Sequence, residues 1–133
     1  MIAAVADTHA ALWYLFGDTR LSSRAKNFID QAAIERRSIE ISPISLAEVV
    51  YLIEKGRIPA SALDNLRNAL DNPNHVFKEA PFTADVVGVM RNVRRDEVPD
   101  MPDRIVAATA LYLGVPVLSR DGRIRAAALQ TIW

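Results

Sequence analysis

Short apolar runs alternate with longer segments of helical hydrophobic spacing along the whole 133-residue chain. Residues 2–6, "IAAVA", are apolar on both faces, which is typical of a strand buried inside a parallel sheet. Further strands are predicted at "SIEISP", "HVFKEAP", "VPVL" and the terminal "TIW". The chain is therefore expected to contain about five short strands separated by helical segments.

The segments between these runs have the apolar spacing of amphipathic helices. The expected helices span residues 10–16, 22–37, 45–55, 59–70, 83–93, 103–113 and 123–129. In the third of them, Ser45 is the expected N-cap, and Leu46, Val49, Val50 and Ile53 form the apolar stripe. Strands alternating with helices predict one α/β domain, residues 1–133, with a mainly parallel sheet.

The composition limits how this domain can meet a partner. The formal net charge is zero, so a nucleic acid could be attracted only by a local positive patch. The chain has 13 Arg and 3 Lys, and Arg forks suit phosphate oxygens, although a genomic preference explains the excess equally well. Cysteine is absent, which excludes disulfides and thiolate ligands. Without a signal peptide pattern or a membrane-spanning apolar run, a cytoplasmic location is expected.

Two acidic residues follow predicted strands. Asp7 comes directly after the first strand, and Asp121 comes shortly after "VPVL". Open parallel sheets bind ligands beyond the carboxyl ends of their strands, so both acids would face one crevice if their strands are neighbours. Each acid also has a local explanation, because Asp7 suits a helix N-cap and Asp121-Gly122 is a common turn dipeptide.

Three more acids lie where helices are expected to start. Glu48 is in a first helical turn, where Ser45-x-x-Glu48 also fits a capping box. Asp100 and Asp103 flank Pro102, where Asp100 suits the N-cap and Asp103 suits the first turn. Gathered in one crevice, these carboxylates would repel one another, and Mg²⁺ or Mn²⁺ would resolve the repulsion.

The segments that carry these acids resemble the PIN-domain ribonucleases, in particular the VapC-like toxins of bacterial type II toxin–antitoxin pairs. The resemblance covers essentially the whole chain, through "VADTHAALWYL", "ISLAEVVYLIEKG", "DMPDRIVAATALYLGVPVLSRDGRI" and "TIW". It implies a three-layer α/β/α fold and a Mg²⁺- or Mn²⁺-dependent endoribonuclease that leaves a 5′-phosphate and a 3′-hydroxyl. It also implies inhibition by a cognate antitoxin protein and assembly as a homodimer.

The same resemblance implies the roles of the acids. Asp7, Glu48, Asp103 and Asp121 would be catalytic, and Asp7, Asp103 and Asp121 would bind metal, with Asp100 as a further candidate ligand. Relatives often read D-P-F-D-R where this chain has "DMPDR", which leaves open whether Asp100 or Asp103 is the main ligand.

Neighbouring polar residues are expected to support the acids. Thr8 and Ser119 would hydrogen-bond them, or else satisfy only local backbone groups. Relatives commonly have Thr in place of Ser119, and the hydroxyl is retained here. Arg104, Arg120 and Arg123 would bind the RNA backbone, with surface ion pairs as the alternative.

The first predicted helix carries four large apolar residues in a row, "WYLF" at positions 13–16. They cannot all face the core, so they either meet a partner, an antitoxin or a second copy of the chain, or cover the edge of the core. His9, at the start of this helix, is a candidate general base or a packed structural histidine.

Three other functions fit parts of the pattern. A catalytically inactive PIN-like module would serve as a nucleic-acid-binding or scaffold domain, and loss of an acid would mark it. A DNA nuclease would use the same metal chemistry. A receiver-like signalling domain also places Asp at strand ends around Mg²⁺, but it uses a late Lys, and the last lysine here is Lys78.

Overall fold

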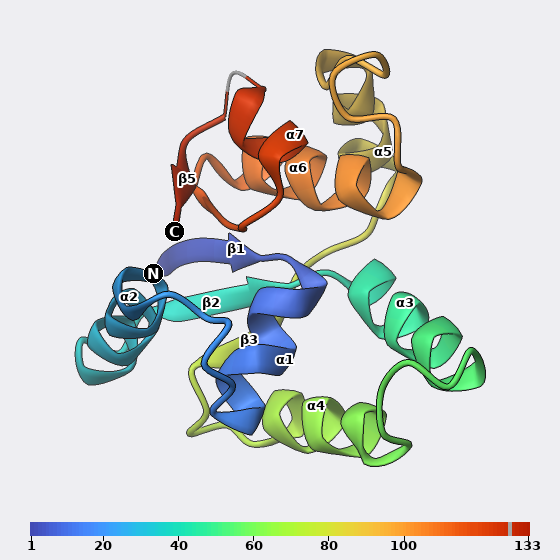
Figure 1. Ribbon diagram of the computed structural model, residues 1–133. Coiled ribbons are helices and arrows are strands. Elements are labelled where there is room, and N and C mark those ends of the chain that lie inside the picture. The colour runs from blue at the N-terminus through green and yellow to red at the C-terminus, as the bar shows by residue number, and fades with distance from the viewer. Residues whose placement is uncertain (128) are drawn as a thin grey trace.

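The computed structural model describes residues 1–127 and 129–133 of the chain (Figure 1). In this part of the chain, five strands form one sheet in the order β3-β2-β1-β4-β5, and all neighbouring strands are parallel. The strands are β1 (Ile2–Ala6), β2 (Ser38–Ile41), β3 (Phe77–Glu79), β4 (Val117–Leu118) and β5 (Thr131–Ile132). The predicted α/β class with a parallel sheet of short strands is confirmed.

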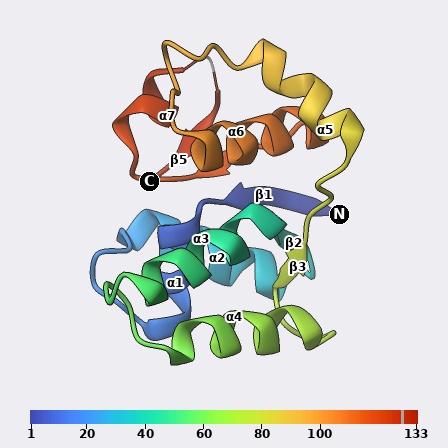
Figure 2. The same cartoon turned by 90° about the vertical axis from the view of Figure 1, so that its right-hand side faces the viewer.

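The helices of the described residues connect these strands. They are α1 (Thr8–Phe16), α2 (Ser23–Ile34), α3 (Pro43–Glu54), α4 (Ser61–Asp71), α5 (Ala84–Val89), the 3₁₀ helix η1 (Met90–Asn92), α6 (Met101–Leu113) and α7 (Gly122–Ala126). Helices α1 to α4 cover one face of the sheet, and α5, α6 and α7 cover the other (Figures 1 and 2). The molecule therefore has the three layers that the resemblance implied.

Each face of the sheet has its own hydrophobic core, and β1 contributes to both. Ala4 and Ala6 pack into the core under α1 to α4, whereas Val5 packs into the core beneath α6. Successive side chains of a strand point to opposite faces, so a strand covered on both sides must be apolar throughout. This explains the uninterrupted apolar run at the start of the sequence.

The central position of β1 brings distant segments together at the carboxyl edge of the sheet. Strand β1 pairs with β4, and the N–H of Asp7 donates to the carbonyl of Leu118 at 3.0 Å. The segment that follows β4 therefore begins beside Asp7. The strands that precede Asp7 and Asp121 are indeed neighbours.

Several helix boundaries differ from the sequence expectations. Helix α3 begins at Pro43 with Ser42 as its N-cap, so the expectation of Ser45 as the cap is wrong. Its buried positions include Val49 and Leu52, while Val50, expected in the apolar stripe, is exposed. Pro43 sets this start, because proline is favoured in a first helical turn directly after a strand has ended.

Other helices are shorter than expected. Helix α2 ends at Ile34, three residues before the expected end, and Arg36 beyond it has a positive φ of 56°. The segment expected as one helix over 83–93 divides into α5 and η1. The last expected helix, 123–129, includes position 128, which lies outside the described residues; α7 covers Gly122–Ala126. None of the helices in the described residues is both long and apolar enough to span a membrane.

Candidate active site

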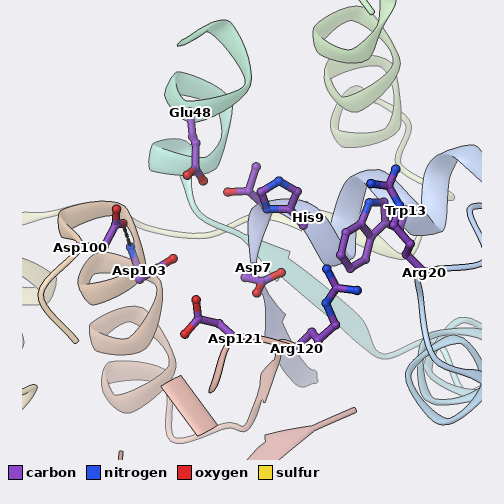
Figure 3. Close-up of a pocket in the computed structure, with 10 residues that line it drawn as sticks. Asp7, His9, Trp13, Arg20, Glu48, Asp100, Asp103, Arg120 and Asp121 are labelled. Carbon is purple, nitrogen blue, oxygen red and sulfur yellow. Dashed lines mark hydrogen bonds between the residues drawn. The ribbon is translucent and has the colours of Figure 1, made fainter. Parts of the chain in front are cut away.

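A polar cavity of about 470 Å³ lies at the carboxyl edge of the sheet (Figure 3). All four acids expected to be catalytic line it, and Asp100 lines it as well. The full lining consists of Asp7, Thr8, His9, Trp13, Arg20, Glu48, Asp100, Asp103, Arg120 and Asp121. Residues separated by more than a hundred positions in the sequence thus share one cavity.

Asp7 is held rigidly at the floor of this cavity. It is the N-cap of α1, and its Oδ1 accepts a hydrogen bond from the N–H of Ala10 at 2.9 Å. Only 9% of the residue is exposed, and this burial raises the pKa of its carboxyl above the usual value. A hydrogen bond from Ser119 lowers the same pKa, but its effect is smaller than that of burial. The capping role therefore coexists with a place in the site, because one carboxylate oxygen is not used by the cap.

Asp121 is fixed in the same way at the end of β4. Its Oδ1 accepts hydrogen bonds from the N–H groups of Arg123 at 2.8 Å and Ile124 at 3.2 Å, which caps α7. Its own N–H donates to the hydroxyl of Ser119 at 3.0 Å. Fully buried Ser119 contacts Asp7 as well, so this one hydroxyl links the two acids at the strand ends.

The start of α6 supplies Asp100 and Asp103. Asp100 is the exposed N-cap, and its Oδ1 accepts a hydrogen bond from the N–H of Asp103 at 3.0 Å. Asp103 is half-buried, and burial is the main reason that its pKa is raised to about 7. The negative charges of Asp100, Asp121, Glu48 and Asp7 raise it further. Asp103 is thus the acid on which the charges of the other four converge.

Glu48 comes from α3 on the opposite wall and points toward the aspartates (Figure 3). With Ser42 as the N-cap, the expected capping box of Ser45 and Glu48 does not form. Buried Ser45 instead accepts a hydrogen bond from the hydroxyl of Thr8 at 3.0 Å, which ties α1 to α3. Thr8 was expected to bond either an acid or local backbone groups; it bonds Ser45 instead and so holds the wall that carries Glu48.

The cavity also has a basic and aromatic wall. The guanidinium of Arg120 lies 4.6 Å from the centre of the Trp13 ring, and that of Arg20 lies 5.1 Å from it. Arg20 donates two hydrogen bonds to the carboxylate of Asp18. Arg120 has no ion pair or hydrogen bond with the described residues, although it adjoins Asp121 in sequence. Cation–π contact with Trp13 therefore positions Arg120 beside the acids.

Trp13 and Arg20 are site residues that the sequence analysis missed. Trp13 is 6% exposed, so of the four "WYLF" residues it turns inward, whereas Phe16 is 43% exposed. Its ring lies 5.5 Å from that of His9, one helical turn earlier. The spacing of four residues between His9 and Trp13 is the sequence signal that would have placed both on one face.

Two of the arginines expected to bind RNA do not line the cavity. Arg104 donates to the carbonyls of Val93 at 3.1 Å and Met90 at 2.8 Å, and so ties α6 to η1. Arg123 is exposed on α7 outside the cavity lining. Of the three expected arginines, Arg120 alone lies at the site.

The donor set fits a hard divalent cation in its chemistry. Five carboxylates surround the cavity, and none of them forms an ion pair with the residues that the structure describes. Over the same residues, no three acidic or histidine side chains converge closely enough to hold an ion as they stand. Mg²⁺ keeps several waters and is bound by only one or two carboxylates, so an open ring of acids suits it.

Comparisons with known proteins show the family of the chain and solved structures of the same fold. A family model of the PIN domain matches residues 4–129. One similar solved structure is VapBC2 from Rickettsia felis bound to a DNA fragment of the VapBC2 promoter. It aligns with a TM-score of 0.71 and 17% sequence identity, and the alignment covers 98% of this chain and 97% of that chain. A toxin–antitoxin complex from Klebsiella pneumoniae aligns with a TM-score of 0.63 and 21% sequence identity, and the alignment covers 98% of this chain and 97% of that chain. FitAcB from Neisseria gonorrhoeae aligns with a TM-score of 0.61 and 19% sequence identity, and the alignment covers 98% of this chain and 96% of that chain. No curated protein matches the chain.

Proposed function

The chain belongs to the PIN domain family, and from this premise we propose that it is a metal-dependent endoribonuclease, the toxin of a toxin–antitoxin pair. The observation that carries the proposal is the ring of five carboxylates, none of which has an ion-pair partner among the described residues. Like charges so arranged destabilise a fold unless something neutralises them. A bound Mg²⁺ or Mn²⁺ ion is the neutralising group that also accounts for their position at the carboxyl ends of the strands.

Asp7, Asp103 and Asp121 would hold the metal, directly or through the waters it keeps, with Asp100 as an additional ligand. When bound, the metal would stabilise negative charge on the phosphodiester and lower the pKa of water. Asp7 and Asp121 suit this task because their capping hydrogen bonds fix the orientation of their carboxylates. Ligands that are held in place in this way need no rearrangement when the substrate binds.

Glu48 and Arg120 would act on the substrate side. From the opposite wall, the Glu48 carboxylate would accept a hydrogen bond from the attacking water and orient it for in-line attack. Arg120, held over Trp13, would bind a phosphate next to the scissile one. Cleavage would leave a 5′-phosphate and a 3′-hydroxyl, the products that the family resemblance implies.

A protein antitoxin is the proposed partner. One of the similar solved structures, from Klebsiella pneumoniae, is a toxin–antitoxin complex. An antitoxin that inserted an Arg or Lys among the five carboxylates would replace the metal's charge and block the cavity. The toxin itself is proposed to be a cytoplasmic homodimer.

The test is cleavage of a mixed pool of structured RNAs by the purified protein with Mg²⁺, with Mn²⁺ and with EDTA. Asp7→Asn is the diagnostic variant, because Asn also caps helices and should preserve α1. Asp64→Asn is the matched control, since Asp64 is an exposed acid in the first turn of α4, outside the cavity.

Cleavage that requires metal, survives in Asp64→Asn and is lost in folded Asp7→Asn would support the nuclease. Equal cleavage by both variants would indicate a contaminating ribonuclease. Absence of cleavage, together with no Mn²⁺ binding in calorimetry, would favour the inactive nucleic-acid-binding module instead. Cleavage of single-stranded DNA at the same rate as RNA would overturn the choice of substrate.

A further inference from the structure

A second polar cavity, of about 440 Å³, lies at the opposite, amino edge of the sheet. It is formed by the end of α2, the start of β2 and the segment leading into β3, near the N-terminus in Figure 1. Its lining consists of Ala33, Arg36, Arg37, Ser38, Pro73, Asn74, His75, Val76 and Lys78. Three cationic side chains and no carboxylate line this cavity, in a chain whose net charge is zero.

Arg36 occupies a backbone conformation that the chain otherwise gives to glycine. In the described residues, four positions have a positive φ: Gly17 (62°), Gly56 (71°), Gly114 (70°) and Arg36 (56°). Each of the four positions lies at the end of a helix. At the end of α2, the N–H of Arg37 donates a hydrogen bond to the carbonyl of Ala32 at 2.9 Å. Glycine is the preferred residue there because a Cβ is strained. Arg36 is the position among these four that carries a side chain, and that side chain lines the cavity.

The neighbouring donors are only partly satisfied. The Nε of Arg37 is buried and has no hydrogen-bond partner among the described residues, while its terminal nitrogen pairs with Glu35 at 2.8 Å. Lys78 donates to the carbonyl of Pro73 at 2.8 Å. The Nδ1 of His75 accepts from the N–H of Phe77 at 2.9 Å, so Nε2 carries the proton in the neutral ring and is a donor.

Acidic residues near this cavity leave its positive charge in excess. Glu35 lies at the end of α2, forms an ion pair with Arg37 and accepts a hydrogen bond from Gln31. Glu40, in β2, is 7% exposed and outside the lining; Lys78 and the N-terminal amine are the positive charges that act on it. The positive charges of Arg36, Arg37 and Lys78 thus exceed the negative charges of Glu35 and Glu40.

We propose that this amino-edge cavity binds a phosphoryl anion, either free phosphate or a phosphate group of a nucleic acid strand. The planar fork of Arg36 matches the geometry of phosphate oxygens, and Arg37 and Lys78 add positive charge to the same lining. The site is separate from the acidic cavity, because parallel strands place the two at opposite edges of the sheet. Its occupation would not depend on the nuclease activity proposed above.

The test is calorimetric titration of the full chain with inorganic phosphate in EDTA, and separately with a short oligonucleotide. Arg36→Gly is the diagnostic variant, since glycine suits the positive φ and should raise the midpoint of thermal unfolding by about 3 °C. We expect it to weaken anion binding about tenfold or more, the loss of one charged hydrogen-bonding partner. Arg67→Ala, which removes an exposed arginine of α4 outside both cavities, is the matched control and should bind as the wild type does.

Asp7→Asn separates this proposal from the nuclease. Binding retained in Asp7→Asn and lost in Arg36→Gly would support the amino-edge site, whatever the outcome of the cleavage assay. Binding of inorganic phosphate would identify a free anion as sufficient, and binding of the oligonucleotide alone would identify a backbone phosphate. No binding of either probe, equal affinity in Arg36→Gly, or loss in Asp7→Asn would overturn the proposal.

Discussion

The two polar cavities of this domain lie at opposite edges of one sheet and carry opposite charges. The acidic cavity gathers five carboxylates from four separate segments, and each aspartate in it except Asp103 also caps a helix. The basic cavity draws on two neighbouring segments and keeps an arginine at a position suited to glycine.

Both regions therefore retain features that cost stability. Like charges repel in the first, and a backbone conformation is strained in the second. Such departures from local preference concentrate where a protein binds something. The comparison predicts that neutralising Asp103 and replacing Arg36 by Gly should each stabilise the ligand-free protein while removing a function.

The largest effect is expected from Asp103→Asn. Removing a metal ligand should reduce cleavage by more than the roughly 10–100-fold typical of outer partners of a metal site. Asp100→Asn tests the additional ligand: Asn keeps the cap, Asp100 is exposed, and its loss should cost less than about tenfold. Initial rates of RNA cleavage measure both. A larger effect of Asp100→Asn would make Asp100 the main ligand.

The repulsion within the acidic cavity should also appear as a pH dependence of stability without metal. The raised pKa of Asp103, about 7, means that the folded state binds the proton more tightly than the unfolded state. Its contribution to folding is therefore best below the unfolded value of 3.8 and worsens as pH rises toward and through 7.

We expect Asp103→Asn in EDTA to be more stable than the wild type at pH 8 by about 1–2 kcal/mol, because partial exposure screens the full shift. The advantage should shrink toward pH 5. Comparing the two proteins removes the opposite contribution of His75, whose pKa is lowered by burial. Urea unfolding at several pH values measures this, and a difference independent of pH would contradict it.

A moderate effect is expected when the bond between two walls of the acidic cavity is removed. Thr8→Val leaves buried Ser45 without its donor and should cost about 1 kcal/mol of unfolding free energy. It should also slow cleavage about tenfold by displacing Glu48. In Thr109→Val, by contrast, the lost hydroxyl contacts only Ile105 of its own helix, so stability should fall without a change in cleavage. Equal cleavage losses in both variants would attribute the effect to stability alone.

The smallest effect is expected at the basic wall of the acidic cavity. Arg120→Ala should raise KM about 2–5-fold. It should also make the plot of the logarithm of RNA affinity against the logarithm of salt concentration less steep by about 0.7, the value for one phosphate contact to a single strand. Arg123→Ala, exposed and outside the cavity, should change both less. Steady-state kinetics at several salt concentrations compare them, and indistinguishable values would show that stacking on Trp13 does not matter.

The sequence by itself was sufficient for the architecture and the family. The uniformly apolar run before Asp7 predicted a strand buried on both faces, and the alternation of strands and helices predicted the parallel sheet. The motifs around Asp7, Glu48, Asp103 and Asp121 indicated the PIN domain, which the family match confirms. These properties follow from local patterns, because strand burial and helix capping depend on residues close in sequence.

Only the tertiary structure decided which side chains meet. The sequence allowed Thr8 to bond an acid and Ser45 to cap a helix; the fold joins the two residues to each other. It turned Trp13 inward beneath Arg120, directed Arg104 toward η1, and opened a basic cavity beside Arg36. Such contacts depend on how α1, α3 and α6 pack across the sheet, and packing joins residues whose separation in sequence carries no periodic signal.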